Sequence, residues 1–210
     1  MKNYLVTFIL FFLIAFMLSP AVFADQIVLQ NGQQLRGDVQ NPSLTLQTSY
    51  AELNLQSQYL NKIERANGNF VVRASASNRF SGQLLSDIIF LSNGREQTFS
   101  AAEISSVDFS NNDAFNDNTQ ISVSLRNDDF FSASTVENSI RINTSLGSLN
   151  ISYNNLNAIE YLRGEDIYLI RRRNASNIKA NLNGQSIIVW PAAGEIFKLG
   201  FEHVSEIVFN

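Results

Sequence analysis

Residues 43–68, SLTLQTSYAELNLQSQYLNKIERANG, recur 96 positions later as residues 139–164, SIRINTSLGSLNISYNNLNAIEYLRG. The two stretches align without a gap, and the alignment extends back to residues 25 and 121. A repeat at a fixed period indicates a modular architecture. Ten positions of the first stretch meet the same residue type in the second: Ser43, Thr48, Ser49, Leu53, Asn54, Leu60, Asn61, Ile63, Glu64 and Gly68.

Apolar and polar residues alternate through both copies of the repeat. Leu53 and Leu55 alternate with polar neighbours in the first copy, and Leu149 and Ile151 do so in the second. A period of two is typical of β-strands that bury one face. Helical periodicity is almost absent, so the sequence predicts an all-β fold, with room for one helical or 3₁₀ turn after each of these segments.

Each repeat is followed by a second segment that matches it more weakly. When their ends are aligned, the ISSVDF of residues 104–109 meets the VSEIVF of residues 204–209. Many short strands at close spacing predict small barrels or sandwiches. We therefore expect two SH3-like or Sm-like barrel or sandwich lobes, each built from two units of about 45 residues. The predicted divisions are lobe 1 at 25–110 (units 25–68 and 69–110), a linker at 111–118, and lobe 2 at 119–210 (units 119–164 and 165–210). The alternative is a single domain in which 111–118 is a long hairpin loop.

The first 24 residues have the pattern of a secretory signal peptide. Lys2 precedes an apolar run at residues 5–18, and Val22 and Ala24 occupy the −3 and −1 positions before Asp25, where small residues are preferred. This arrangement predicts cleavage after Ala24 and export to the periplasm or beyond. An uncleaved membrane anchor is the alternative, although the apolar run is short for a span of about 20 residues. The chain contains no cysteine, which excludes disulfides and a lipid anchor on cysteine.

The net charge of −4 excludes the strongly basic class of nucleic-acid-binding proteins. No second apolar run is long enough for a transmembrane helix, so none is expected after cleavage. The partners that remain are an envelope protein or an anionic envelope component, or a second copy of the chain paired through its β-edges.

The sequence contains no recognisable catalytic, cofactor-binding or metal-binding pattern. His203 is the one histidine, and Glu202 beside it would point to the opposite face of a strand. A zinc site needs three or four converging ligands. The adjacent carboxylates Asp128 and Asp129 would either point apart on a strand or be solvated in a turn. We therefore predict no catalytic residue, no cofactor and no metal.

Two features are candidates for contact with a partner. Arg171, Arg172 and Arg173 form the single basic run and are expected at an exposed turn, where they would meet an anionic group. Trp190 stands beside Pro191, where a strand is expected to end, and it is the aromatic residue most suited to line a surface groove.

The first unit contains a pattern of twelve spaced residues: Asp25, Ile27, Leu29, Asn31, Gly32, Leu35, Gly37, Val39, Thr48, Tyr50, Ala51 and Ile63. This pattern resembles a segment at the front of bacterial salt-induced outer-membrane proteins of unknown function. Gln33 and Glu52 depart from that pattern, and the family's following transmembrane barrel has no counterpart here. The resemblance implies an envelope location and an all-β module, without a biochemical activity.

These observations favour an exported, non-enzymatic protein that acts as a binding or scaffolding module of the cell envelope. One alternative is a periplasmic hydrolase that uses carboxylates, which would require two or more of them in one pocket. Another is a small outer-membrane barrel, although the expected strands of about four to six residues are shorter than the 9–11 that a bilayer requires.

Overall fold

The computed structural model describes residues 24–110, 119–144 and 147–210. These residues form twenty strands and no α-helix, which confirms the all-β prediction. Eighteen of the strands pair antiparallel in one large network, the other two form a separate pair, and no closed barrel is detected among the described residues. The predicted linker, and all of the predicted signal peptide except Ala24, lie outside the described residues.

The first half of the chain pairs its strands in the order β9-β8-β2-β1-β10-β5-β6-β7-β3-β4. Its strands are β1 (Asp25–Leu29), β2 (Gln34–Val39), β3 (Ser43–Gln47), β4 (Glu52–Gln56), β5 (Leu60–Ala66), β6 (Asn69–Ala74), β7 (Arg79–Leu84), β8 (Ile88–Ser92), β9 (Arg95–Phe99) and β10 (Ile104–Asp108).

The second half repeats this order as β19-β18-β12-β11-β20-β15-β16-β17, while β13 and β14 form a separate two-stranded sheet. Its strands are β11 (Ile121–Leu125), β12 (Phe130–Thr135), β13 (Ser139–Thr144), β14 (Gly147–Ser152), β15 (Leu156–Leu162), β16 (Ile167–Arg172), β17 (Ile178–Ala180), β18 (Ser186–Pro191), β19 (Phe197–Gly200) and β20 (Val204–Phe209).

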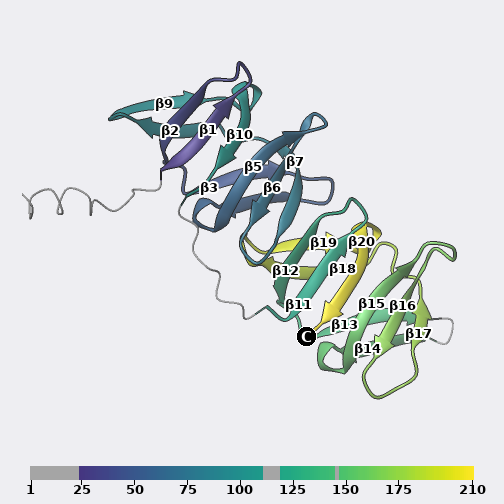
Figure 1. The fold of residues 1–210 in the computed structure, drawn as a ribbon. Helices are drawn as coiled ribbons and strands as arrows, with labels where there is room; N and C mark the ends of the chain where they lie inside the picture. The colour runs from purple at the N-terminus through teal and green to yellow at the C-terminus, as the bar shows by residue number, and fades with distance from the viewer. Residues whose placement is uncertain (1–23, 111–118, 145–146) are drawn as a thin grey trace, which may run out of the picture.

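The pairing groups the strands into four modules that lie in a row (Figure 1). Module A contains β1, β2, β8, β9 and β10, and module B contains β3 to β7. Modules C and D are their counterparts, with β11, β12, β18, β19 and β20 in C and β13 to β17 in D. Modules A and C therefore combine the beginning and the end of each half. The boundary that the sequence predicted between units 25–68 and 69–110 falls in the turn that joins β5 to β6, which is inside module B.

Each of the four modules contains one short 3₁₀ turn, directly before β5, β10, β15 or β20. The turns are η1 (Ser57–Tyr59), η2 (Ala101–Glu103), η3 (Tyr153–Asn155) and η4 (Phe201–His203). Each turn is followed by a buried aliphatic residue that begins the next strand, namely Leu60, Ile104, Leu156 or Val204. Two of the turns, η1 and η3, lie where the sequence left room for one. Among the described residues, no helix has the length and apolar character to span a membrane.

Candidate functional site

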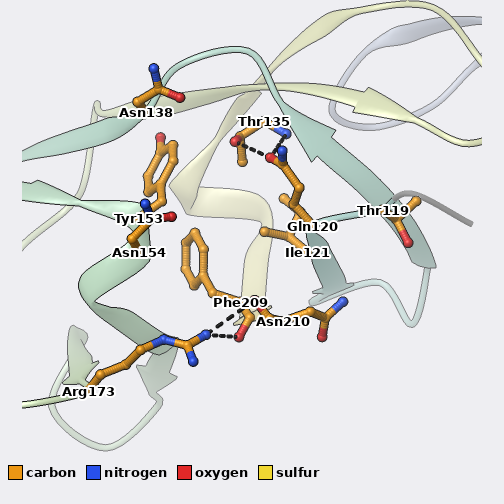
Figure 2. A pocket seen from close by; sticks show the side chains of 10 residues that line it. All are labelled: Thr119, Gln120, Ile121, Thr135, Asn138, Tyr153, Asn154, Arg173, Phe209 and Asn210. Carbon is orange, nitrogen blue, oxygen red and sulfur yellow. Dashed lines mark hydrogen bonds between the residues drawn. The ribbon is translucent and has the colours of Figure 1, made fainter.

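A cavity of about 550 Å³ lies where module C meets module D (Figure 2). Strands β11, β12 and β20 supply one side, and η3 and the chain just after β16 supply the other. The lining is rich in carboxamides and hydroxyls and includes no Asp or Glu. The residues that line it are Thr119, Gln120, Ile121, Thr135, Asn138, Tyr153, Asn154, Arg173, Phe209 and Asn210.

Arg173 has the one charged side chain that lines this cavity, and it is one of the three arginines that the sequence singled out. Its Nε donates to the carbonyl of Leu156 at 3.0 Å, and its Nη2 donates to the carbonyl of Phe209 at 3.0 Å and to the main-chain oxygen of Asn210 at 3.2 Å. These bonds fix the guanidinium at the end of β20, and Nη1 has no partner among the described residues. The cavity therefore presents a positioned guanidinium.

Tyr153 and Phe209 form the aromatic part of the cavity. Their rings stack with centroids 5.2 Å apart, and the Tyr153 hydroxyl has no hydrogen-bond partner within the described part of the chain. Burial, followed by the charge of Glu137, raises the pKa of Tyr153 well above its usual value of 10.0. The phenol is therefore neutral at physiological pH and can both donate and accept a hydrogen bond.

Gln120 lines another part of the cavity and is fixed there by Thr135. Its carboxamide oxygen accepts from the backbone N–H of Thr135 at 3.3 Å and from the Thr135 hydroxyl at 2.9 Å. These bonds occupy the oxygen and leave the carboxamide N–H₂ as a donor. Together with the guanidinium, this makes the lining rich in donors, which suits a ligand group that carries negative charge or several acceptors.

Besides the arginine run, one signal for this cavity can be found by comparing the two repeats. In the gap-free repeat alignment, Tyr153 falls on Ser57 of the first half. Strand pairing likewise makes Arg173 the equivalent of Ser75 in the first half, because the β5–β6 and β15–β16 hairpins share their register. An aromatic residue and a cation thus replace two serines in the second lobe. Comparison of the two repeats points to such positions, whereas motif searching does not.

The other two arginines of the run do not converge with Arg173. Arg171 lies on β16 and its Nη2 contacts the carboxylate of Glu160 at 2.6 Å. Arg172 points to the other face of the strand, where its Nε donates to the carbonyl of Ser176 at 2.7 Å. The run lies at the end of a strand, and strand alternation divides it among three environments.

Trp190 is on β18, with 56% of its surface exposed. Its Nε1 donates to the carbonyl of Gly194 at 3.1 Å, so the indole braces the turn that follows Pro191. Strand β18 ends at Pro191, where the sequence placed its end. The turn braced by Trp190 contacts module B, which gives this residue a place in the junction between the two halves.

The sequence predicted that Asp128 and Asp129 point apart on a strand or are solvated in a turn, and for Asp129 this is wrong. Asp128 is exposed, with a φ of 66°, but the Asp129 side chain is fully buried in the junction between modules B and C. The Asp129 carboxylate accepts from the Ser81 N–H at 2.9 Å, the Ser81 hydroxyl at 2.7 Å and the Tyr50 hydroxyl at 3.1 Å. It also contacts Arg79 at 3.3 Å and accepts from Asn127 Nδ2 at 3.0 Å. Most partners of the buried charge therefore come from the other half of the chain.

Tyr50 gives this junction a dependence on alkaline pH. Burial, followed by the charge of Asp129, raises the pKa of Tyr50 far above its usual value of 10.0. A raised pKa means that Tyr50 loses its proton at lower pH in the unfolded chain than in the folded one. The contribution of Tyr50 to the free energy of unfolding is therefore fully present below pH 10 and declines as the pH rises above it. We expect the Tyr50→Phe variant to lose less stability than the wild type between pH 9 and 11, by up to about 1.4 kcal/mol per pH unit above 10. Urea unfolding at each pH measures this difference, and equal slopes for the two proteins would contradict it.

The structure places His203 beside one carboxylate and one aromatic ring. Its Nε2 lies 3.9 Å from the Glu202 carboxylate, and its ring lies 6.2 Å from that of Tyr50. Among the described residues, no group of three or more His, Asp or Glu side chains is arranged to hold a metal ion.

Comparison with known proteins adds no relative. No protein-family model matches the chain, no curated protein matches it, and no solved structure matches its fold.

Proposed function

We propose that this chain is an exported, non-enzymatic binding protein of the bacterial cell envelope, with its binding site in the cavity between modules C and D. The observation that carries the proposal is the composition of that cavity. A fixed guanidinium, free carboxamide donors and a stacked aromatic pair surround it, and no Asp or Glu side chain lines it. Such a lining can hold and orient an anionic or acceptor-rich group.

The location in the envelope rests on the sequence. The pattern of the first 24 residues is that of a secretory signal peptide, and the first unit resembles the front of salt-induced outer-membrane proteins. We further propose that residues 25–110 and 119–210 are two small sandwich-like lobes. In this arrangement lobe 1 is a support, and lobe 2 contains the site.

A cavity-filling substitution tests the proposal. Asn154 is exposed and lines the cavity, so Asn154→Trp is expected to obstruct it while leaving the core intact. Asn157, which is equally exposed but lies outside the lining, gives the matched control Asn157→Trp. The purified proteins are immobilised and exposed to envelope extract, and the retained components are quantified by mass spectrometry.

We expect one component to be retained by the wild type and by Asn157→Trp, and to be reduced at least about tenfold on Asn154→Trp, because a tenfold loss corresponds to about 1.4 kcal/mol. Equal retention by all three proteins, or no retention by any of them, would contradict a binding site at this cavity.

A further inference from the structure

Lobe 1 already shows how the outer edge of its β3–β4 hairpin binds an added segment. The backbone N–H of Gln56 on β4 donates to the carbonyl of Ala193 at 3.0 Å, and Leu55 forms an antiparallel bridge with Gly194. A Cβ on Gly194 would lie 3.4 Å from the Leu55 side chain and 3.5 Å from the Asn54 carbonyl, which are ordinary van der Waals distances, so the added segment packs closely on the strand. The edge therefore binds the backbone of the added segment.

The same edge also recognises a carboxylate. The carboxamide Nδ2 of Asn54 donates to Oε1 of Glu195 at 3.1 Å, one residue beyond the bridge. The segment bound at β4 thus has the order small residue, glycine, acid, and each of the three positions has its own contact on the strand. This is strand addition within one chain.

Lobe 2 carries the same edge on β14. The register of β13 with β14 repeats that of β3 with β4 pair by pair, since Ser139 faces Ser152 as Ser43 faces Gln56. The residues equivalent to Asn54, Leu55 and Gln56 are Asn150, Ile151 and Ser152. The carboxamide is retained, and the outward N–H of Ser152 corresponds to the N–H that binds Ala193.

Among the described residues, the outer edge of β14 pairs with no strand. It borders a groove of about 260 Å³ instead. Strand β14 also lacks the usual protection of a free edge, because residues 147–152 include no charge and no proline, whereas the free edge β9 has Arg95 and Glu96. The groove is lined by Leu149, Asn150, Ile151, Ser152, Asn155, Arg172, Asn174 and Ala175.

The groove has a positive charge that its counterpart in lobe 1 does not have. Arg172 is its one charged lining residue, and among the described residues only its Nε has a hydrogen-bond partner, the carbonyl of Ser176. By hairpin register, the residue of lobe 1 that is equivalent to Arg172 is Ala74. The preference for an acid that Asn54 provides in lobe 1 is therefore reinforced in lobe 2 by a guanidinium.

We propose that the β14 groove binds an extended acidic peptide segment of a partner protein by strand addition, with a carboxylate at Asn150 and Arg172. This inference rests on the proposed binding function, but it assigns a second site with a different ligand. The backbone of Ser152 anchors the segment, and Arg172 selects its charge.

A peptide with the sequence of residues 190–197, WPAAGEIF, is the probe, since it contains the segment that binds the equivalent edge. The β4 edge is already covered by this segment within the chain, so a fluorescently labelled peptide reports on β14. Fluorescence anisotropy with the purified full chain is expected to show saturable binding. Replacing the glutamate of the peptide with glutamine is expected to weaken binding about tenfold, as loss of a charge-assisted contact does.

Adjacent arginines supply matched variants of the protein. Arg172→Ala is expected to weaken peptide binding about tenfold, whereas Arg171→Ala, on the opposite face, is expected to leave it unchanged. Arg172→Glu combined with a peptide that has lysine in place of glutamate is expected to restore binding, which a merely misfolded variant would not do.

Absence of saturable binding, or equal effects of Arg171→Ala and Arg172→Ala, would overturn this inference. The cavity test is independent of it, because Asn154 does not line the β14 groove. Retention of an envelope component that is sensitive to Asn154→Trp would leave the proposed function standing even if the peptide fails to bind.

Discussion

Replacing Asp129 with alanine is expected to lower the free energy of unfolding by about 3–5 kcal/mol, the usual cost of removing one member of a buried, hydrogen-bonded charge network. The Asp129 side chain is fully buried and compensated by Arg79, Ser81 and Tyr50. Its removal leaves Tyr50 and the Ser81 N–H without this acceptor inside the junction, where each unpaired group costs about 1–3 kcal/mol, whereas Arg79 keeps the carbonyl of Asp128. The docking of lobe 1 on lobe 2 is therefore the part of the fold that this variant weakens most.

Equilibrium unfolding in urea, followed by tryptophan fluorescence, measures this loss. Trp190 is the one tryptophan and contacts the turn that packs on β4, so its emission reports on the junction. Asp128→Asn is the matched control. Asp128 is exposed and asparagine tolerates its positive φ, so this variant is expected to stay within about 0.5 kcal/mol of the wild type. Similar stabilities for the Asp129 and Asp128 variants would show that the network contributes little.

The role of Asp129 illustrates what the sequence did not reveal. Local pattern predicts that Asp128 and Asp129 either point apart on a strand or are solvated in a turn, and neither interpretation predicts that Asp129 is buried. The partners of Asp129 are supplied by Ser81 and Tyr50, which lie 48 and 79 residues away along the chain. The burial of a carboxylate by such contacts depends on how two lobes dock, which alternation of apolar residues does not encode.

The fold was predictable to the level of strands and repeats. Period-two alternation identified the strands because a half-buried strand must alternate. The choice of partner strand was not predictable in the same way, because β2 pairs with β8 across about 50 residues of intervening chain. The modules therefore interleave, and the order of eight strands in the first half recurs in the second, 96 residues later in the repeated segment.

The candidate site was predictable only in part. The arginine run drew attention to the region that contains both the cavity and the β14 groove, but its three members face different partners. Arg173 lines the cavity, Arg172 lines the groove, and Arg171 pairs with Glu160. Composition identifies such a run, whereas strand direction decides which member reaches which site.

Replacing Gly82 with alanine is expected to destabilise the protein by about 3 kcal/mol or more, at the upper end of the range for overpacking. A Cβ at this position would lie 2.2 Å from the carbonyl oxygen of Gln47 and 2.8 Å from its carbonyl carbon. Both atoms belong to backbone, so no side-chain rotation relieves the clash and β3 must move away from β7. Glycine within a strand often marks such a close approach of two backbones.

Gly164→Ala is the control, since a Cβ there meets no atom within 4 Å and its φ is not in the left-handed region. It is expected to be neutral or to stabilise by about 0.4–1 kcal/mol through the unfolded state. Urea unfolding of the two variants measures the contrast. A cost below about 1 kcal/mol for Gly82→Ala would mean that β3 shifts without losing its pairing, since overpacking with a real clash typically exceeds this value.

The second lobe shows the arrangement that is expected when β3 moves away from β7. Hairpin register makes Ala180 the equivalent of Gly82, because Tyr168 faces Ala180 as Phe70 faces Gly82. In that lobe β13 and β17 share only the isolated bridge between Asn143 and Asn181, and β13 and β14 stand apart as their own sheet. Gly82→Ala is thus expected to break the β3–β7 ladder first. Hydrogen exchange should accelerate at the backbone N–H of Leu85, which donates to Thr45, before it accelerates in β1, β5 or β10.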